Sequence, residues 1–564
     1  MEIIETILAR RGYNTQSARD AFLSPDYGMA HDPFLLPDMD LAVDRLILAR
    51  KKQEKIMIYG DYDIDGLTST ALLMDSLDKF GFKNIMTFIP NRFIEGYGLT
   101  IDAIENISKT DTQLIITVDC GSLSEKEIVR ANELGIDVIV TDHHNVAPVQ
   151  PPAVAVINPK RLLQDYPADY KDLMLIPDSK QKGKIYPFLD LPGVGVAFKL
   201  VQALQTRLNG LPIGQEKWLL DLVALGTVCD VVNLVDENRI HVHWGLKVLA
   251  KTRRYGLKAL MAVSGVEPES VNARSLGFAL GPRMNAAGRL VTAQIALDML
   301  TADDPQVALI KAMKLDEMNK TRRAEQDIIF QQAIEQAERQ AKDSVLVVSQ
   351  KDWNHGIVGI VAAKLLEKYK KPTYVLSENG DETKGSARSF GDFSVADAIR
   401  ASDDIITKGG GHKLAAGVTL PTKNIVKFRE RVNMFYSDLQ LKSQAEKLLA
   451  VADIEVSFDK ITKKLVDDIS RLEPFGNMNP QPVMKTSSVL VQAIRTMGVN
   501  NQHVKLSAVD NNITLQLIAF NAPEHFFVEP GTSVDIWYEI IENEWRGNTS
   551  IEGRLLRVDG VEKY

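Results

Sequence analysis

Short apolar runs alternate with helix-like segments between about residues 55 and 158. The runs cover residues 56–59, 85–89, 114–118, 137–141 and 153–157. Helical patterns fill three of the four gaps, and a proline-rich loop precedes the last run. Strands that alternate with helices at this spacing are typical of βαβ units. The pattern therefore predicts an α/β fold built on a parallel, doubly wound sheet.

Polar side chains follow every one of these runs. They are Asp61, Asp63 and Asp65; Asn91 and Arg92; Asp119; Asp142, His143 and His144; and Asn158. Ligands of doubly wound sheets bind outside the carboxyl ends of the strands, so we expect these groups to gather along one edge. One acidic strand end is common by chance, but three acidic ends with paired histidines are not. The set favours a site for hard cations over a solvated acidic turn.

The run Asp61–Gly66 alone also resembles a calcium loop of the EF-hand type. That loop needs a bidentate glutamate six residues after its glycine, and Leu72 occupies that position here. Asp230 is a further carboxylate in an otherwise apolar run, residues 224–232. A buried carboxylate without a partner is costly, so we expect a metal or another cation beside it.

Two glycine-rich stretches allow two interpretations each. Residues 191–197 open a helix with Gly193 and Gly195, whose amides suit either a phosphate or a close-packed turn. Residues 281–289 place Arg283 and Arg289 among small residues. These arginines suit an anion pocket, or else an exposed helix start.

Later segments indicate further domains. A long, mostly charged helix is predicted from Asp304 to Lys342, and its pattern favours a solvent-exposed bridge between two domains. A second α/β unit follows, with residues 385–389 and 408–412 suited to a phosphate backbone. From about residue 450, five β-rich runs predict a small barrel such as an OB-fold. There, Phe475, Trp537, Tyr538 and Trp545 suit either a core or a base-stacking face.

Composition narrows the class of protein. Of the 564 residues, 45% are hydrophobic and 25% are charged, as in ordinary globular proteins. No apolar stretch is long enough to span a membrane. Two cysteines indicate a reducing compartment, so we expect a cytoplasmic protein. The net charge of −8 argues against coating a nucleic acid over a broad surface but allows a local basic channel.

The motifs resemble a known superfamily. Gly60–Gly66, Val118-Asp119, Asp142-His143-His144 and Asp230 are similar to the DHH phosphoesterases. The resemblance narrows to the RecJ family through Pro90–Leu99, Gly281–Arg289, His355–Gly359, Ser386–Ser389 and Gly409–Gly417, with Leu472–Pro480 similar to the start of its OB domain. Met478 departs from a usual glycine, and Gln481 from a common glutamate.

The resemblance implies an architecture and an activity. The architecture is a parallel-sheet DHH lobe, a long helix, a second α/β (DHH-associated) lobe and a C-terminal OB-fold barrel. We expect domains at 1–54 (helical), 55–300 (DHH catalytic), 301–342 (connecting helix), 343–445 (substrate-binding) and 446–564 (OB-fold). The activity is 5′-to-3′ exonuclease action on single-stranded DNA, releasing mononucleotides in recombination and repair.

The resemblance also implies a catalytic site with two Mn²⁺ or Mg²⁺ ions, and carboxylates with imidazole suit these ions. Asp61 and Asp63 would hold one ion, and Asp65 and His143 the other. Asp119 and Asp230 would bridge the ions or complete their ligand sets. Asp142 and His144 would orient ligands or contact the scissile phosphate.

The family further implies contacts to single-stranded DNA. Arg92, Arg283, Ser386 and Arg388 would contact the 5′ phosphate, Asn285 and Arg289 would contact the strand, Tyr97 would stack on a base, and His355 and His412 would line a channel between the α/β lobes. Expected protein partners are a RecQ-type helicase and a single-strand binding protein.

Two other functions remain compatible with the motifs. The first is a small-substrate DHH phosphoesterase that hydrolyses oligonucleotides or cyclic dinucleotides by the same chemistry. The OB-like segment and the long helix weigh against it, because a small substrate needs neither. The second is a non-catalytic scaffold, which the presence of every expected ligand disfavours.

Overall fold

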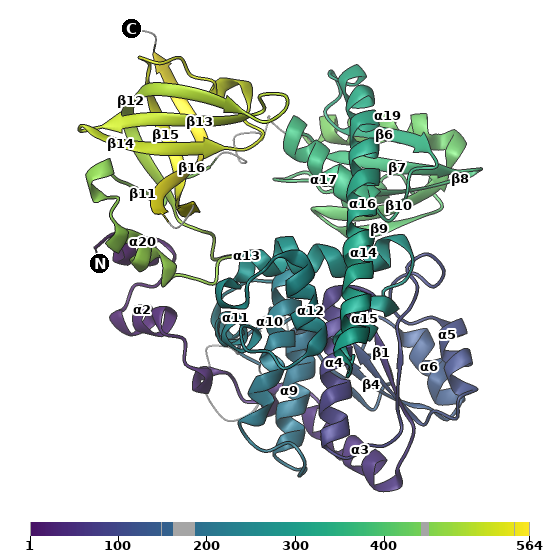
Figure 1. Cartoon of the computed structure of the whole chain (residues 1–564). Coiled ribbons are helices and arrows are strands. Elements are labelled where there is room, and N and C mark those ends of the chain that lie inside the picture. Colours follow the sequence, from purple (N-terminus) through teal and green to yellow (C-terminus); the bar gives the residue numbers. More distant parts are fainter. Residues whose placement is uncertain (1, 148, 162–185, 441–449, 546–547, 563–564) are drawn as a thin grey trace. The chain divides into compact units, whose positions relative to one another are not determined.

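The computed structural model describes residues 2–147, 149–161, 186–440, 450–545 and 548–562 (Figure 1). The chain forms two compact units. One comprises Met1–Ala30, Asn233–His243 and Leu449–Tyr564, and the other comprises His31–Val232 and Trp244–Leu448. Among the described residues, no helix is long and apolar enough to cross a membrane.

The second unit contains the predicted parallel sheet. Its strands are β1 (Ile56–Gly60), β2 (Ile85–Phe88), β3 (Leu114–Val118), β4 (Asp137–Thr141) and β5 (Ala155–Ile157). They pair in the order β2-β1-β3-β4-β5, and every pairing is parallel. The strand order reverses between β1 and β3, which is where ligands bind in doubly wound sheets. The prediction of the sheet is confirmed.

Helices cover this sheet and extend the lobe. Their bounds are α3 (Met39–Lys52), α4 (Ile64–Lys79), α5 (Ile101–Ser108), α6 (Glu125–Glu133), α9 (Gly193–Gln205), α10 (Leu220–Cys229), α12 (Tyr255–Ser264), α14 (Gly281–Leu290) and α15 (Gln294–Leu300). Strand residues alternate between the two faces, and side chains such as Tyr59 and Ile115 form a core with Ile104 and Ile128 from α5 and α6. The helices α4, α9 and α10 contact one another and carry residues of the site.

Helix α16 runs over Pro305–Arg339, close to the predicted span, and the Asp304 side chain caps it by accepting bonds from the amides of Gln306 and Val307. The expected long helix between the two α/β lobes is confirmed, but it is not solvent-exposed on all sides, because one of its faces is buried. Alanines on that face, such as Ala308 and Ala312, allow close packing, and the helix contacts α12, α14, α15 and α17 (Val358–Tyr369). The charged residues on its other faces conceal this stripe in the sequence.

The second lobe of this unit is a mixed sheet in the order β6-β7-β8-β10-β9. Its elements are β6 (Leu346–Lys351), β7 (Thr373–Asn379), β8 (Glu382–Arg388), α18 (Val395–Arg400), β9 (Lys408–His412), β10 (Ala415–Pro421) and α19 (Ile425–Asp438). The predicted phosphate-binding stretches fall at the end of β8 and on β9. Figure 1 shows α16 beside this sheet.

The other unit holds the predicted barrel and two N-terminal helices, α1 (Glu2–Arg10) and α2 (Gln16–Leu23). The barrel strands are β12 (Val483–Met497), β13 (His503–Asp510), β14 (Ile513–Ala519), β15 (Ser533–Trp545) and β16 (Asn548–Glu562), and pairing of β12 with β15 closes them. β11 (Ile454–Glu455) pairs beside β12, and α20 (Lys463–Ser470) precedes the barrel. This closed barrel confirms the expected fold.

The aromatic residues of the barrel are mostly core. Tyr538 is fully buried, Phe475 packs against the core, and Trp537 is buried beneath the cations of Lys485 and Arg557. The side chain of Trp545 lies outside the described residues. Met478 has a φ of 59°, a left-handed conformation that favours glycine, which gives a physical reason for the glycine expected there.

Candidate metal centre and anion pocket

The aspartate run turns sharply after β1. A Cβ at Gly60 would lie 2.2 Å from Thr70 Oγ1, and one at Gly66 would lie 2.4 Å from the Asp61 carbonyl oxygen. Only glycine fits such close approaches. The Asp63 side chain caps α4 by accepting bonds from the amides of Asp65 and Gly66. The turn thereby buries the carboxylates of Asp61 and Asp65 at the strand end.

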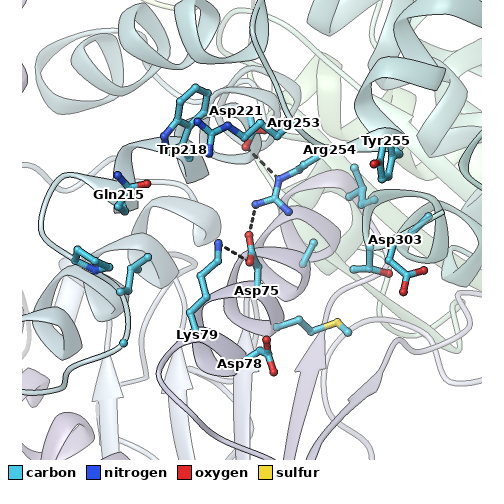
Figure 2. A pocket seen from close by; sticks show the side chains of 18 residues that line it. Asp75, Asp78, Lys79, Gln215, Trp218, Asp221, Arg253, Arg254, Tyr255 and Asp303 are labelled. Carbon is cyan, nitrogen blue, oxygen red and sulfur yellow. Dashed lines mark hydrogen bonds and ion pairs between the residues drawn. The ribbon is translucent and has the colours of Figure 1, made fainter. Parts of the chain in front are cut away.

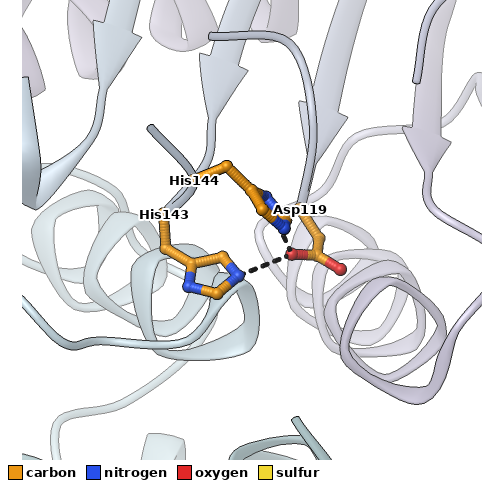
Figure 3. A group of neighbouring side chains, drawn as sticks. All are labelled: Asp119, His143 and His144. Atoms are coloured by element: carbon orange, nitrogen blue, oxygen red, sulfur yellow. Dashed lines mark ion pairs between the residues drawn. The ribbon is translucent and has the colours of Figure 1, made fainter. Parts of the chain in front are cut away.

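Side chains from three other segments meet these carboxylates. Asp119 follows β3 with a φ of 62°, His143 follows β4, and Asp230 caps the C-terminal end of α10. His143 Nε2 lies 3.1 Å from Asp119 Oδ1, 3.5 Å from Asp230 Oδ2 and 3.7 Å from Asp65 Oδ2. Figure 3 shows Asp119 facing both His143 and His144. The structure thus brings together the predicted site.

Three overlapping groups of these side chains have ligand atoms within 4.8 Å of one another. They are Asp61, Asp63 and Asp119; Asp65, His143 and Asp230; and Asp119, His143 and His144. Within this site, four buried atoms have no hydrogen-bond partner among the described residues: Asp61 Oδ1, Asp119 Oδ1, His143 Nε2 and Asp230 Oδ2. Buried polar atoms are ordinarily paired. Their convergence, and their oxygen and imidazole chemistry, fit Mn²⁺ or Mg²⁺.

The pKa shifts of these side chains also favour a cation site. Burial, reinforced by the charge of Asp63, raises the pKa of Asp65 to about 7. Burial and then the charge of Asp65 raise the pKa of Asp230 to about 9, and the same two causes raise the pKa of Asp119. Burial and the neighbouring His144 lower the pKa of His143 to about 3. Crowding of the carboxylates disfavours their ionised forms, and a bound cation would offset this.

The start of α9 contacts the aspartates through Gly193 and Val194. The amides of Gly193 and Val194 donate to Asp65 Oδ2 at 2.6 Å and Oδ1 at 2.8 Å. A Cβ at Gly193 would lie 2.7 Å from the Asp119 Cβ. Of the two interpretations of this stretch, the close-packed turn is therefore correct. The helix N-terminus stabilises a carboxylate of the protein itself.

Asp142 and His144 form a linked pair beside the centre. Asp142 accepts bonds from the amides of Ser122, His143 and His144, and its Oδ1 lies 2.9 Å from His144 Nδ1. Burial alone would raise the pKa of Asp142, but the hydrogen bond and charge of His144 outweigh it and lower that pKa. Burial likewise would lower the pKa of His144, but Asp142 raises it. Asp142 therefore orients the histidine loop.

Tyr97 extends this pair. Its hydroxyl lies 3.0 Å from His144 Nδ1, while the residue as a whole is 53% exposed. This exposure is compatible with the base stacking that the family resemblance implies, which stays a prediction, and the hydroxyl adds a contact that the sequence did not indicate. Asn158 supports the loop by donating to Ser122 Oγ and to the His144 carbonyl.

A group of arginines lies where the two α/β lobes meet. The Arg92 guanidinium is 4.5 Å from the centre of the Tyr62 ring, and Arg289 donates to the Gly356 carbonyl at 2.9 Å. Burial and the charges of Arg92, Arg322 and Arg388, in that order, lower the pKa of Arg289 to about 10. Cations held this close to one another favour an anion between them.

The DHH-associated lobe adds Ser386 and Arg388 to this group. We name the cluster the anion pocket for its charge, and it comprises Arg92, Arg289, Arg322, Ser386 and Arg388. A Cβ at Gly359 would lie 3.3 Å from Ser386 Oγ and 3.4 Å from an Arg388 nitrogen, so the start of α17 borders both side chains. Arg322 is buried on α16 and donates to Asn319 and Gln326. Arg322 gives no signal in the sequence, because it lies in a helix whose pattern is charged on most faces.

The four other residues predicted to contact nucleic acid have different surroundings. Arg283 pairs with Asp316 at 2.8 Å and donates to the Ala279 carbonyl. Asn285 is half-buried on α14. His355 lies edge-on to the Phe93 ring at 4.9 Å. His412 is on the exposed strand β9, two strands from Arg388 and in the same row, about 10 Å away by strand spacing.

A separate hollow of about 910 Å³ lies at the far ends of α4 and α10 (Figure 2). Asp75 pairs there with Lys79 and Arg254, and Arg254 also reaches Asp221. These ion pairs tie α4 to the start of α10, whose opposite end carries Asp230. We interpret the cluster as a brace that fixes the two helices.

Family models match three parts of the chain. The DHH family N-terminal domain matches residues 55–227, the DHHA1 domain residues 342–438, and the RecJ OB domain residues 452–556. Two relatives are single-stranded-DNA-specific exonucleases RecJ. That of Bacillus subtilis is 37% identical over 96% of this chain and 66% of its own length. That of Salmonella typhimurium is 34% identical over 90% of this chain and 88% of its own length.

Solved structures agree with the sequence relatives. RecJ of Thermus thermophilus in complex with Mn²⁺ matches with a TM-score of 0.80 at 26% identity, over 100% of this chain and 76% of that protein. The Mg²⁺ complex matches with a TM-score of 0.76 at 25% identity, over 100% and 75%. The chain spans just under two thirds of the Bacillus relative, 88% of the Salmonella relative and about three quarters of the protein in the two Thermus structures.

Proposed function

This chain belongs to the RecJ family, and we propose that it is a metal-dependent exonuclease that degrades single-stranded DNA from the 5′ end in recombination and repair. The main support is the set of buried ligand atoms without hydrogen-bond partners at the edge of the sheet. The two relatives are named single-stranded-DNA-specific exonucleases, and a related structure holds Mn²⁺.

The distances between the side chains suggest which residues hold each ion. Asp61, Asp63 and Asp119 would hold one Mn²⁺ or Mg²⁺ ion, and Asp65, His143 and Asp230 the other, with Asp119 close enough to His143 to serve both. When bound, the two ions lower the pKa of the attacking water and neutralise charge on the phosphate. His143, with its lowered pKa, offers an uncharged ligand nitrogen.

His144 acts on the substrate side of the centre. Its pKa is raised by Asp142 and its side chain is 37% exposed, so it presents a proton that can hydrogen-bond a phosphate oxygen. Asp142 and the Tyr97 hydroxyl hold the ring in place. We assign Asp142 an orienting role, because its oxygens accept backbone amides.

The anion pocket binds the phosphate at the 5′ end. Arg92, Arg289, Arg322 and Arg388 supply charge, and Ser386 supplies a hydroxyl. A pocket near the metal centre sets the distance from the chain end to the scissile bond, which suits release of single nucleotides. The half-buried Asn285, with His355 and His412, extends the contacts along the strand, whereas Arg283 supports α16 through Asp316.

The remaining parts of the proposal concern the rest of the chain. The OB barrel gives a sequence-tolerant grip on the strand. We retain the division into residues 1–54, 55–300, 301–342, 343–445 and 446–564 as functional segments. A cytoplasmic location fits the two free cysteines. A RecQ-type helicase and a single-strand binding protein are the partners to test by copurification.

The test is Asp119→Ala. Of the three carboxylates that face His143 Nε2, Asp119 is the nearest, at 3.1 Å. Its loss would remove a ligand that lies close to both predicted ion sites. We expect cleavage of single strands to fall below detection while strand binding, measured by fluorescence anisotropy, stays within a few-fold. Asp303→Ala, which changes an exposed carboxylate of the distant hollow, is the control. Retained cleavage by Asp119→Ala would remove the assignment.

A further inference from the structure

An exposed aromatic side chain lies on a rare stretch of helix. Residues Leu276–Leu280 form a π-helix between the short helix α13 (Ala273–Ser275) and α14. π-Helical turns are uncommon and often occur at functional sites. Phe278 on this segment is 73% exposed, and the exposed Arg274 places its guanidinium carbon 5.6 Å from the centre of the Phe278 ring. The two side chains form one aromatic and cationic surface.

This segment is fixed against the chain that carries the metal ligands. Cys229, which precedes Asp230, donates from Sγ to the Leu276 carbonyl at 3.7 Å. A Cβ at Gly281 would lie 2.7 Å from the same sulfur and 3.4 Å from Ile64 Cδ1, so the backbone approaches the aspartate turn closely. Standard bond lengths then place the Cα of Phe278 at most about 20 Å from that of Asp230.

Helix α14 relates the surface to the anion pocket. Its first residue, Gly281, lies beside Cys229, while a Cβ at Gly288 would lie 3.3 Å from the Tyr62 carbonyl, and Arg289 belongs to the anion pocket. A helix of 10 residues is about 15 Å long. The anion pocket and Phe278 therefore lie near opposite ends of α14, with the aspartate turn alongside.

We propose that Phe278 and Arg274 bind a nucleotide on the 3′ side of the scissile bond. This inference rests on the proposed exonuclease function. The Phe278 ring stacks on a base, which any base can satisfy, and Arg274 pairs with a backbone phosphate. With the 5′ phosphate held at the other end of α14, a strand must extend past the metal centre to reach Phe278. The contact then retains the strand after each cleavage and does not touch the nucleotide being released.

Abasic scanning tests this contact. Single strands carrying a 5′ phosphate and one abasic site at successive positions are digested by the wild-type protein and by Phe278→Ala. For the wild type we expect one position, beyond the first nucleotide, where the abasic site raises KM by about 5- to 150-fold, the range for one base stack. Phe278→Ala should raise KM on intact strands similarly, lose that position-specific penalty, and cleave a 5′-phosphorylated dinucleotide at the wild-type rate. Phe278→Trp should restore wild-type KM.

The controls separate the possible failures. Tyr255→Ala removes another exposed aromatic ring, at the far hollow, and should leave KM and the abasic profile unchanged. If Phe278→Ala keeps the wild-type profile, or slows the dinucleotide as much as long strands, the inference is wrong. If the wild-type protein cleaves no single strand at all, the proposed function fails first, and that result is recognisable without any variant.

Discussion

Gly193→Ala would place a methyl group directly against a predicted metal ligand, Asp119. The added methyl group would lie 2.7 Å from the Asp119 Cβ, 2.9 Å from its Oδ1 and 3.0 Å from its Cα. Ordinary contacts begin near 3.4 Å, so Asp119 or the start of α9 must move by roughly half an ångström or more. The same amide donates to Asp65 Oδ2, so both aspartates are disturbed at once.

The magnitude follows from two costs. Overpacking of a tight interior costs about 1–3 kcal/mol of folding free energy, which lowers the melting temperature by a few degrees. Misplacing a catalytic ligand by about an ångström costs on the order of 100-fold in rate. We therefore expect kcat on a 5′-phosphorylated single strand to fall about 100-fold, with a smaller change in KM.

The assay compares this variant with Gly195→Ala. Gly195 is two residues along the same helix turn, but its Cβ would meet Pro192 at 3.1 Å and Leu191 at 3.3 Å, away from the aspartates. We expect this control to lose some stability and keep kcat within about 3-fold. Equal kcat for Gly193→Ala and the wild type would refute the close approach that defines the site.

Three further outcomes follow. Folding raises the pKa of Asp65 to about 7 and of Asp230 to about 9, so the folded metal-free protein retains protons that the unfolded chain releases near pH 4. The stability that these groups contribute is fully present below about pH 4. It is lost as the pH rises toward 9, by about 1.4 kcal/mol per pH unit for each carboxyl between its unfolded and folded pKa, and saturating Mn²⁺ should remove most of this loss. Melting curves between pH 5 and 9, with EDTA or Mn²⁺, measure it; a metal-free stability that rises with pH contradicts it. Arg322→Gln should raise KM about 10-fold for 5′-phosphorylated strands and leave KM for 5′-hydroxyl strands unchanged. The reason is that one contact between a charged side chain and a phosphate contributes about 1.5–3 kcal/mol at most. Equal changes in KM for both substrates would exclude Arg322 from the anion pocket. Met478→Gly should stabilise the barrel unit by about 0.5–1 kcal/mol in urea denaturation, because it relieves a left-handed φ; a loss of stability would show that the methionine side chain makes a larger contribution.

The sequence predicted the sheet and its acidic edge because period-2 and period-3.6 patterns are local. Each strand run was followed within a few residues by the side chains that later met in space, so parallel strand geometry was enough to predict that Asp61, Asp119 and His143 converge. Asp230 lies at the end of a helix. In the sequence it stands out only because burying an unpaired carboxylate among apolar residues is costly.

Other features could not be predicted because they depend on the tertiary fold. Gly193 looked equally suited to a phosphate until Asp65 was found to accept its amide. Arg322 was hidden in a charged helix, since burial of one face depends on what packs against it. Arg283 resembled Arg289 in sequence, yet Asp316 on α16 pairs with the first, while the second reaches the anion pocket.

The most direct test of the central claim is the order in which label leaves a single strand. The EDTA-treated protein is given strands of some tens of nucleotides, each carrying a 5′ phosphate and labelled at one end, with and without Mn²⁺. We expect that, only with Mn²⁺, the 5′ label appears at once as mononucleotide while 3′-labelled strands shorten progressively. Release of 3′ label first, cleavage of dinucleotides alone, or equal activity in EDTA would contradict it.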